Sequence, residues 1–556
     1  MPFQEIDPKE KLKNIQRKEE EDLALLLSKK YRVPYINLSR VSIDPDALRL
    51  VPEERARRAG LATIRIAGKN VQVAVKNPSS PAIKEIVDEL HRTGYQPELF
   101  LVSLQSLESA WTRYAELGAE TTVTSNVIDI ARVGMQEFDE QVKNTADLQK
   151  FLKMKISLGA ADRITNLLDL VLAGAYQLEA SDIHVEPAEE TVHVRVRIDG
   201  VLQDIITFPH KATKMLTSRI KLISELKLNI HDRPQDGRFT IRAGGKDVEV
   251  RVSTLPGPNG ESVVMRILYP KTIALTFEDL GMQPYVKKMI ERELAQPNGM
   301  IITTGPTGSG KTTTLYAFIK KVNNPEIKII TIEDPIEYHI EGIEQTQTNK
   351  GAGYTFESGL SAIMRQDPDI ILVGEIRNHE TAEIALQASL TGHLVFSTLH
   401  TNNAPGTIPR LIDLGAHPNI IAPAINIAIA QRLVRRLCAN CKKETAPSSE
   451  EFEIIKKELE TLPKEYERPT LENIKIYKEG GCEKCNNTGF KGRIGVYEAF
   501  RISDEVEKLI LKNPTEAEVR DLAVSQGMIT LKQDGILKAL TGITSLAELE
   551  RVVGFA

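Results

Sequence analysis

Alternating and continuous runs of apolar residues indicate where this chain forms strands. In Thr191–Ile198 every second residue is Val or Ile, so the apolar side chains share one face and a half-buried strand is predicted. Other segments are largely apolar throughout, as strands buried on both faces of a parallel sheet are. These segments are Met300–Thr304, Ile327–Ile332, Ile370–Val373 and Leu394–Thr398. Because helical periodicity separates them, the pattern predicts an α/β fold with a parallel sheet.

The same patterns predict several domains, as expected for 556 residues at about 150 residues per domain. A small α/β domain comes first, followed by a polar linker that has room for short helices and an arginine-rich second domain. The third domain contains the apolar strands, an insertion and a C-terminal helical subdomain. The expected boundaries are 1–114 for the first domain, 115–156 for the linker, 157–270 for the second domain and 271–556 for the third, with the insertion at 436–490 and the helical subdomain at 498–556.

A complete phosphate-binding loop follows the first apolar strand of the third domain. It reads Gly305-Pro306-Thr307-Gly308-Ser309-Gly310-Lys311-Thr312 and leads into a helical segment. The glycines let backbone N–H groups converge on phosphate oxygens at a helix N-terminus. We therefore predict binding of a nucleoside triphosphate, with Lys311 on the β- and γ-phosphates and Thr312 on Mg²⁺.

Acidic residues follow two other apolar strands. Glu375 comes shortly after Ile370–Val373, and Glu333, with Asp334 and Glu337 nearby, follows Ile327–Ile332. Because carboxyl ends of parallel strands meet at one sheet edge, we expect these groups near Lys311. Glu333 and Glu375 are both candidates to activate water, with Glu333 preferred, and Glu375 is also a candidate Mg²⁺ ligand.

Two histidines flank the fourth apolar strand. His400 follows the strand, at the expected carboxyl edge, and we predict that it senses the γ-phosphate. His393 precedes the strand, and its role stays open between sensing and structure.

The four cysteines form two C-x-x-C pairs. They are Cys438, Cys441, Cys482 and Cys485. Paired units of this kind in an intracellular chain predict a closed, structural Zn²⁺ site with four thiolate ligands. A redox dithiol is the alternative, but no thioredoxin-like βαβ pattern surrounds the cysteines.

The amino-acid composition disfavours some classes of function. A net charge of -5, a pI near 6.2 and 5% aromatic residues disfavour broad nucleic-acid binding. No stretch approaches the roughly 18 uninterrupted apolar residues of a membrane span, and the dense charge of Lys9–Asp22 argues against a signal peptide. We therefore expect a cytoplasmic protein without a transmembrane segment and with no direct nucleic-acid partner.

Four ordered motifs resemble the secretion ATPases of type II secretion and type IV pilus systems. The motifs are the Walker A loop 305–312, the aspartate box 331–338, the Walker B segment 367–377 and the histidine box 391–402. The resemblance covers roughly residues 157–556. It implies a RecA-like P-loop ATPase core, a PAS-like α/β second domain and the zinc-binding insertion. It also implies ATP, Mg²⁺ and Zn²⁺ as cofactors.

The resemblance also implies a set of nucleotide-binding residues. Arg251 and Arg266 of the second domain contact phosphates during catalysis, and Arg493 resembles a further family position. The expected nucleotide-binding residues of the third domain are Gly305, Pro306, Thr307, Gly308, Ser309, Gly310, Lys311, Thr312, Thr313, Arg365 and Arg377.

Further implications concern assembly and direction of work. The family resemblance implies a homo-hexameric motor that hydrolyses ATP, lies at the inner membrane through a platform protein, and drives pilin polymerisation or pseudopilus-based export. The insertion and the N-terminal domain resemble the assembly or secretion branch. The family's cyclic di-GMP repeat is not intact before Tyr31, so cyclic di-GMP binding is not expected. An ATP-gated scaffold and a nucleic-acid translocase are the remaining alternatives.

Overall fold

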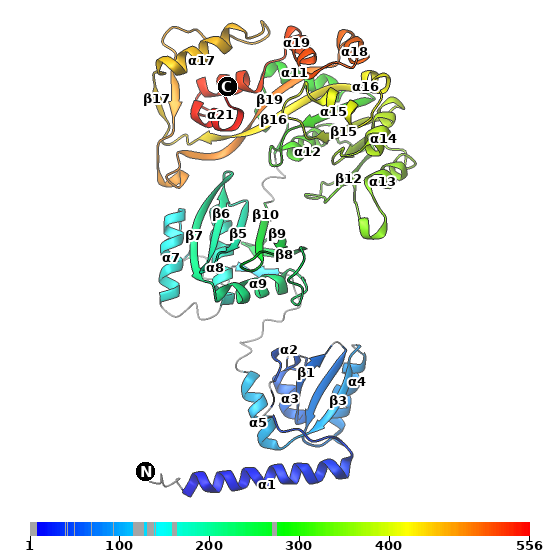
Figure 1. Cartoon of the computed structure of the whole chain (residues 1–556), viewed down its shortest axis with the longest axis vertical. Coiled ribbons are helices and arrows are strands. Elements are labelled where there is room, and N and C mark those ends of the chain that lie inside the picture. The colour runs from blue at the N-terminus through cyan, green and yellow to red at the C-terminus, as the bar shows by residue number, and fades with distance from the viewer. Residues whose placement is uncertain are drawn as a thin grey trace. The chain divides into compact units, whose positions relative to one another are not determined.

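The computed structural model describes residues 8–38, 41, 43–48, 50–67, 69–92, 94–114, 127–130, 138, 141–157, 164–269 and 275–555. The chain divides into two compact units, Met1–Ser125 and Asn126–Ala556 (Figure 1). Among the described helices, none combines the length and the apolar character needed to cross a membrane.

The first unit is a small α/β domain with a three-stranded sheet in the order β1-β2-β3. Its long N-terminal helix is fixed through Glu21, whose carboxylate accepts hydrogen bonds from Ser103 Oγ at 2.6 Å and Ser106 Oγ at 3.0 Å. The unit has its own apolar core, which includes Trp111. Its elements are α1 (Pro8–Tyr31), α2 (Pro45–Leu48), α3 (Glu53–Ala59), β1 (Leu61–Ala67), β2 (Asn70–Val75), α4 (Pro81–Arg92), β3 (Gln96–Leu101) and α5 (Leu104–Thr112).

The second domain contains a seven-stranded sheet in the order β4-β8-β9-β10-β5-β6-β7. The strand predicted at Thr191–Ile198 is β6, with its four apolar residues buried and the alternate residues half-buried, as the alternation predicts. Its elements are β4 (Val127–Asp129), α7 (Thr145–Ser157), α8 (Ile164–Gln177), β5 (Asp182–Pro187), β6 (Thr191–Ile198), β7 (Val201–Pro209), α9 (Ala212–Ile223), β8 (Gln235–Ala243), β9 (Lys246–Leu255) and β10 (Ser262–Leu268).

The expected linker at 115–156 differs from the structure. Strand β4 pairs in parallel with β8, and α7 buries Leu148, Phe151 and Leu152 in the core of the second domain. Residues 127–130 and 141–156 are therefore structural parts of that domain. Sequence pattern missed them because β4 has three residues and its partner lies more than 100 residues away. Residues 115–126 lie outside the described part of the chain.

The third domain contains a second seven-stranded sheet, in the order β13-β12-β14-β15-β11-β16-β19. Figure 1 labels β12, β15, β16 and β19 of this sheet. The strands from β13 to β16 are parallel, and β19 pairs antiparallel with β16. The four predicted apolar strands are β11, β12, β14 and β15, all buried along their length. The predicted parallel α/β sheet is thus confirmed.

The remaining elements surround this sheet or form the insertion, where β17 and β18 make a two-stranded sheet. The elements of the third domain are η4 (Glu278–Leu280), α11 (Pro284–Leu294), β11 (Gly299–Thr304), α12 (Lys311–Val322), β12 (Ile329–Glu333), β13 (Glu344–Gln347), η5 (Lys350–Ala352), α13 (Phe356–Ile363), β14 (Ile370–Val373), α14 (His379–Leu390), β15 (Leu394–Leu399), α15 (Thr407–Asp413), α16 (Pro418–Ala424), β16 (Ile425–Leu437), β17 (Lys443–Thr445), α17 (Ser449–Glu460), β18 (Ile476–Lys478), η6 (Glu483–Cys485), β19 (Phe490–Arg501), α18 (Asp504–Ile510), α19 (Glu516–Ser525), α20 (Leu531–Leu540) and α21 (Leu546–Val553).

The C-terminal helices pack into the same core as the sheet, through residues such as Ile536 and Leu549. A buried ion pair fixes them there. Asp534 and Lys538, both almost fully buried, lie 2.5 Å apart, and Asp534 also accepts hydrogen bonds from Gln283 Nε2 at 2.8 Å and the Tyr497 N–H at 2.7 Å. The helical subdomain is therefore continuous with the ATPase domain rather than a separate body.

Candidate nucleotide site

Four strands that end in motif residues lie side by side in the third domain. Strands β12, β14, β15 and β11 are neighbours in that order and run in the same direction. The aspartate box, the Walker B segment, the histidine box and the phosphate-binding loop therefore leave the sheet at one edge, where ligands of open α/β sheets bind.

The phosphate-binding loop lies between the end of β11 at Thr304 and the start of α12 at Lys311. Gly305, Gly308 and Gly310 have φ values of 146°, 78° and 90°, which residues with a side chain rarely adopt. A Cβ atom at Gly305 would also lie 2.5 Å from the backbone oxygen of Gln431. The glycines of the motif are therefore needed for both backbone conformation and space.

Polar groups of the loop have the chemistry for an anion. Lys311 Nζ is buried and donates to the backbone oxygens of Gly305 at 2.8 Å and Pro306 at 3.2 Å. Burial lowers the pKa of Lys311 to about 8, an effect that the nearby charge of Glu375 opposes. The buried Ser309 Oγ has no hydrogen-bond partner within the described chain. Triphosphate oxygens would supply acceptors to both side chains.

Glu375 lies where the Walker B segment leaves β14. One carboxylate oxygen is 2.5 Å from Nη2 of Arg377, and the other is 3.4 Å from Nε2 of His400. The structure thus brings together three residues that the sequence placed separately, close enough to Lys311 for Glu375 to affect its pKa.

His393 lies at the opposite edge of the sheet. Its backbone oxygen accepts the N–H of Gly299, at the start of β11, and its Nδ1 is 3.0 Å from the backbone oxygen of Ala388. Since β11 and β15 run in parallel, this position is at the amino ends of the strands. This position favours a structural role for His393, which stays a prediction.

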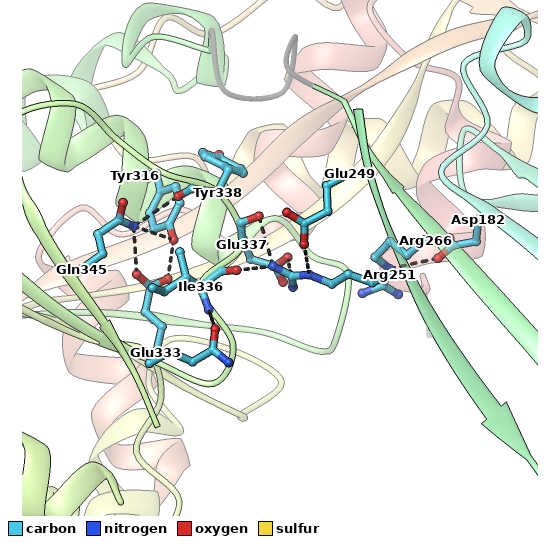
Figure 2. Close-up of polar contacts among 11 residues, drawn as sticks. Asp182, Glu249, Arg251, Arg266, Tyr316, Glu333, Ile336, Glu337, Tyr338 and Gln345 are labelled. Carbon is cyan, nitrogen blue, oxygen red and sulfur yellow. Dashed lines mark hydrogen bonds and ion pairs between the residues drawn. The ribbon is translucent and has the colours of Figure 1, made fainter. Parts of the chain in front are cut away.

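Glu333, the last residue of β12, is 3% exposed and held by three side chains. Tyr316 Oη and Gln345 Nε2 donate to its carboxylate, the latter at 3.3 Å (Figure 2). Thr331 Oγ1 donates to it as well, at 2.7 Å. Burial raises the pKa of Glu333, while these hydrogen bonds oppose the rise. Tyr316 belongs to α12, so the carboxylate is tied directly to the helix that begins at the phosphate-binding loop.

Two arginines of the second domain lie opposite each other on paired strands. Arg251 on β9 and Arg266 on β10 are register partners, so their side chains share one face of the sheet. Arg266 Nε donates to Asp182 at 3.0 Å. Arg251 Nη1 is 2.9 Å from Glu337 of the aspartate box, and Nη2 donates to the backbone oxygen of Ile336 (Figure 2).

The other predicted residues take different positions. Arg365, two residues after the end of α13, donates through Nη1 to the backbone oxygen of Ser361 in that helix, at 2.8 Å. Thr313 lies near Tyr338 of the aspartate box, where it opposes the rise that burial causes in the pKa of Tyr338. Thr312 is half-buried in the first turn of α12. The nucleotide roles of Arg365 and Thr313 stay predictions.

Sequence reasoning missed the contribution of β16. Gln431 Oε1 accepts the Thr314 hydroxyl at 2.7 Å, and its backbone oxygen lies against Gly305. These contacts arise because β16 pairs with β11. No motif marks these contacts. The sequence feature that could have indicated them is a C-terminal strand with polar residues inside an apolar run.

The four cysteines converge in the insertion. Their Sγ atoms all lie within 4.8 Å of one another, with separations of 3.8 Å for Cys438–Cys482, 3.7 Å for Cys441–Cys485 and 3.6 Å for Cys482–Cys485. Four sulfurs bound tetrahedrally at Zn–S distances near 2.3 Å are about 3.8 Å apart. The cluster therefore fits a zinc ion.

Comparisons with known proteins agree with this site. Residues 159–551 match the family described as Type II/IV secretion system protein, and residues 31–121 match the MshEN domain. The type IV pilus assembly ATPase PilB of Myxococcus xanthus is 38% identical over 537 residues, 96% of this chain and 91% of that protein. The type II secretion system ATPase E of Vibrio cholerae is 43% identical over 389 residues, 70% of this chain and 75% of that protein.

Among solved structures, the pilus retraction motor PilT with bound ADP matches at 26% identity and a TM-score of 0.46, over 68% of this chain and 95% of that chain. The family match covers the sheet, the phosphate-binding loop and all the motif residues that surround it. The protein is an ATP-hydrolysing enzyme, as the sequence predicted. The chain belongs to the family of type II/IV secretion system proteins.

Proposed function

We propose that this ATPase drives type IV pilus assembly from the cytoplasmic side of the inner membrane. One observation carries the proposal. The pilus assembly relative from Myxococcus xanthus matches along 96% of the chain, whereas the type II secretion relative matches 70%. The N-terminal region is thus part of the likeness to the pilus motor, and a type II secretion ATPase is the second candidate.

Gene deletion in the source organism distinguishes the two candidates. Loss of surface pili, with secreted proteins unchanged, is expected for a pilus assembly motor. Loss of exported proteins with pili intact would instead favour type II secretion. Complementation with the wild-type gene should restore the phenotype, and complementation with Lys311→Ala should not.

At the site, we propose that Lys311 and the loop backbone bind the triphosphate and that Thr312 and Glu375 hold Mg²⁺. When bound, Mg²⁺ would neutralise charge on the phosphate oxygens. Glu333, whose pKa is raised by burial, accepts a proton from the attacking water. His400, next to Glu375, responds to the presence of the γ-phosphate.

Two carboxamide variants separate the proposed roles of the carboxylates. Glu333→Gln removes the proton acceptor and should abolish phosphate release while ATP and Mg²⁺ still bind. Glu375→Gln removes a metal ligand and should raise the Mg²⁺ concentration needed for half-maximal activity. The opposite assignment would follow if Glu375→Gln alone stopped turnover at saturating Mg²⁺.

We further propose that six copies form a ring in which Arg251 and Arg266 stabilise the transferred phosphate, and that a platform protein of the inner membrane is the partner. Arginines supplied by a mobile neighbour are a common device of phosphate-transfer motors. Specific ATPase activity should rise with protein concentration as rings form. Native mass spectrometry of the zinc-replete chain would measure the number of copies.

Measurements of ring formation and of phosphate release also distinguish this function from two others. A scaffold would bind ATP and form rings without releasing phosphate, and a nucleic-acid translocase would release phosphate faster when DNA is added at physiological salt. We do not propose cyclic di-GMP as a ligand of this chain. Titration of the full chain with this dinucleotide tests the expectation that it does not bind.

A further inference from the structure

Arg432 lies beside the phosphate-binding loop but belongs to none of the family motifs described above. It is on β16, directly after Gln431, whose side chain contacts the first turns of α12. The next residue, Leu433, lies within 3.4 Å of the position that a Cβ at Gly310 would take. The backbone of β16 therefore runs along the loop at Arg432, whose side chain leaves the strand on the opposite face from Gln431 and Leu433.

The histidine box holds one side of the Arg432 guanidinium. Nη2 donates to the backbone oxygen of Asn402 at 3.1 Å and lies 3.4 Å from Asn402 Oδ1. Asn402 is two residues after His400. These bonds place the guanidinium between the strand that borders the loop and the segment that carries the predicted γ-phosphate sensor.

The other side of the guanidinium has no partner in the described structure. Nη1 is buried and makes no hydrogen bond. Leaving a charged donor unsatisfied in a buried position is costly. Glu498 is near enough to favour the charged form of Arg432, yet the two groups form no ion pair within 4 Å among the described contacts, and Glu498 accepts the N–H of Ala404 instead.

The surrounding charges indicate what kind of group completes the site. Arg432 and Lys311 are close enough for the arginine to disfavour the charged form of the lysine. Two cations beside each other and one unused donor make an environment that is complementary to an anion. Backbone N–H groups at the N-terminus of α12 add to the same field.

We propose that Nη1 of Arg432 donates to a phosphate oxygen of the bound nucleotide and that Asn402 holds the guanidinium in the geometry for this bond. The inference rests on the ATP site of the proposed function and adds to it an arginine from the same ATPase domain. Arg432 would thereby join the triphosphate to the histidine box through Asn402.

Calorimetric titration of the full-length, zinc-replete chain with MgATP and MgADP tests the proposal. Arg432→Gln should weaken MgATP binding about tenfold or more, the loss expected for one charge-assisted hydrogen bond. Arg432→Lys keeps the charge without the planar fork and should lose less. Arg436→Gln, an exposed arginine on the same strand, is the matched control and should bind as the wild type does.

Asn402→Ala provides a second variant that leaves Arg432 in place. It should weaken MgATP binding in the same direction, by a smaller factor, because the guanidinium is no longer held. Each variant is compared with the wild type by its thermal unfolding midpoint without nucleotide, so that a folding defect is seen separately from a binding defect.

The outcomes are distinct. A loss for both MgATP and MgADP supports a bond to the α- or β-phosphate, and a loss for MgATP alone supports a bond to the γ-phosphate. Wild-type affinity for both nucleotides in a folded Arg432→Gln variant overturns the inference. Lys311→Ala serves as the reference, because retained binding in that variant would overturn the nucleotide site itself.

Discussion

The Nε2 atom of His400 lies 3.4 Å from a carboxylate oxygen of Glu375. One residue follows β15 and the other follows β14, and these strands are neighbours in the sheet. The contact therefore joins the histidine box to the Walker B segment beside Lys311. The two side chains are in direct contact, without any intermediate group.

His400→Ala is expected to lower the rate of phosphate release on the order of 100-fold, because the proposed function places this polar group next to the reacting phosphates. His393→Ala is the matched control, since His393 lies at the amino edge of the same strand. Steady-state phosphate release measures both. Equal losses in the two variants would contradict the assignment of His400 to the site.

Tyr316→Phe removes one of the three donors to the buried carboxylate of Glu333. The expected cost is about 1.5–3 kcal/mol of unfolding free energy, since the acceptor is charged and buried. Tyr354→Phe, which removes a hydroxyl bonded to Thr346, should cost about 0.5–1.5 kcal/mol. Calorimetry compares the two variants through the unfolding transition whose midpoint temperature shifts when ATP is added. Equal costs would argue against an ionised Glu333.

Removal of zinc should destabilise the insertion, because without the metal the four thiolates no longer hold the two C-x-x-C turns together. Elemental analysis is expected to find one zinc per chain, and Cys438→Ser with Cys485→Ser should abolish it. Limited proteolysis should then cut within residues 438–489. A zinc-free chain that resists proteolysis as well as the native one would show that the cluster is not structural.

Lys538→Met is expected to cost about 3–5 kcal/mol of unfolding free energy, because it leaves Asp534 buried without its partner. The double variant Asp534→Leu with Lys538→Met should cost less than the sum of the single changes. Urea unfolding measures the free energy of unfolding of each variant, using the same transition that responds to ATP. Strict additivity would mean that the two side chains do not interact.

Arg251 has one partner in the structure, Glu337, and another in the proposed function, a phosphate. A charge exchange tests which of the two contacts activity requires. The exchange Arg251→Glu with Glu337→Arg should restore the ion pair and the stability that Arg251→Glu alone loses. It should not restore ATP hydrolysis, because the positive charge is moved. Recovery of turnover in the exchanged pair would indicate that the ion pair itself is what activity requires.

Much of the nucleotide site could be predicted from the sequence because its residues follow apolar strands directly. Glu333, Glu375 and His400 each lie within two residues of a strand end, and parallel strands bring such ends together. The closeness of His400 and Glu375 needed only the further fact that β14 and β15 are neighbours.

Contacts that depend on distant pairing could not be predicted. Gln431 lies 117 residues from Thr314, whose hydroxyl it accepts, and only the pairing of β16 with β11 brings them together. The linker was misjudged for the same reason, because the partner of β4 is distant and three residues carry too little periodicity to indicate a strand. Arg432 combines both difficulties, since it lies outside every motif and its neighbours come from other elements.

The second half of β16 extends from Gln431, which touches the phosphate-binding loop, to Leu437, directly before Cys438 of the zinc cluster. It pairs with β19 along this length, with a register irregularity between Arg435 and Leu437. At roughly 3.3 Å per residue, this part of the strand spans about 20 Å. We expect any displacement of the loop to reach the cysteine cluster along this paired strand, with the irregularity before Leu437 as a break in the pairing.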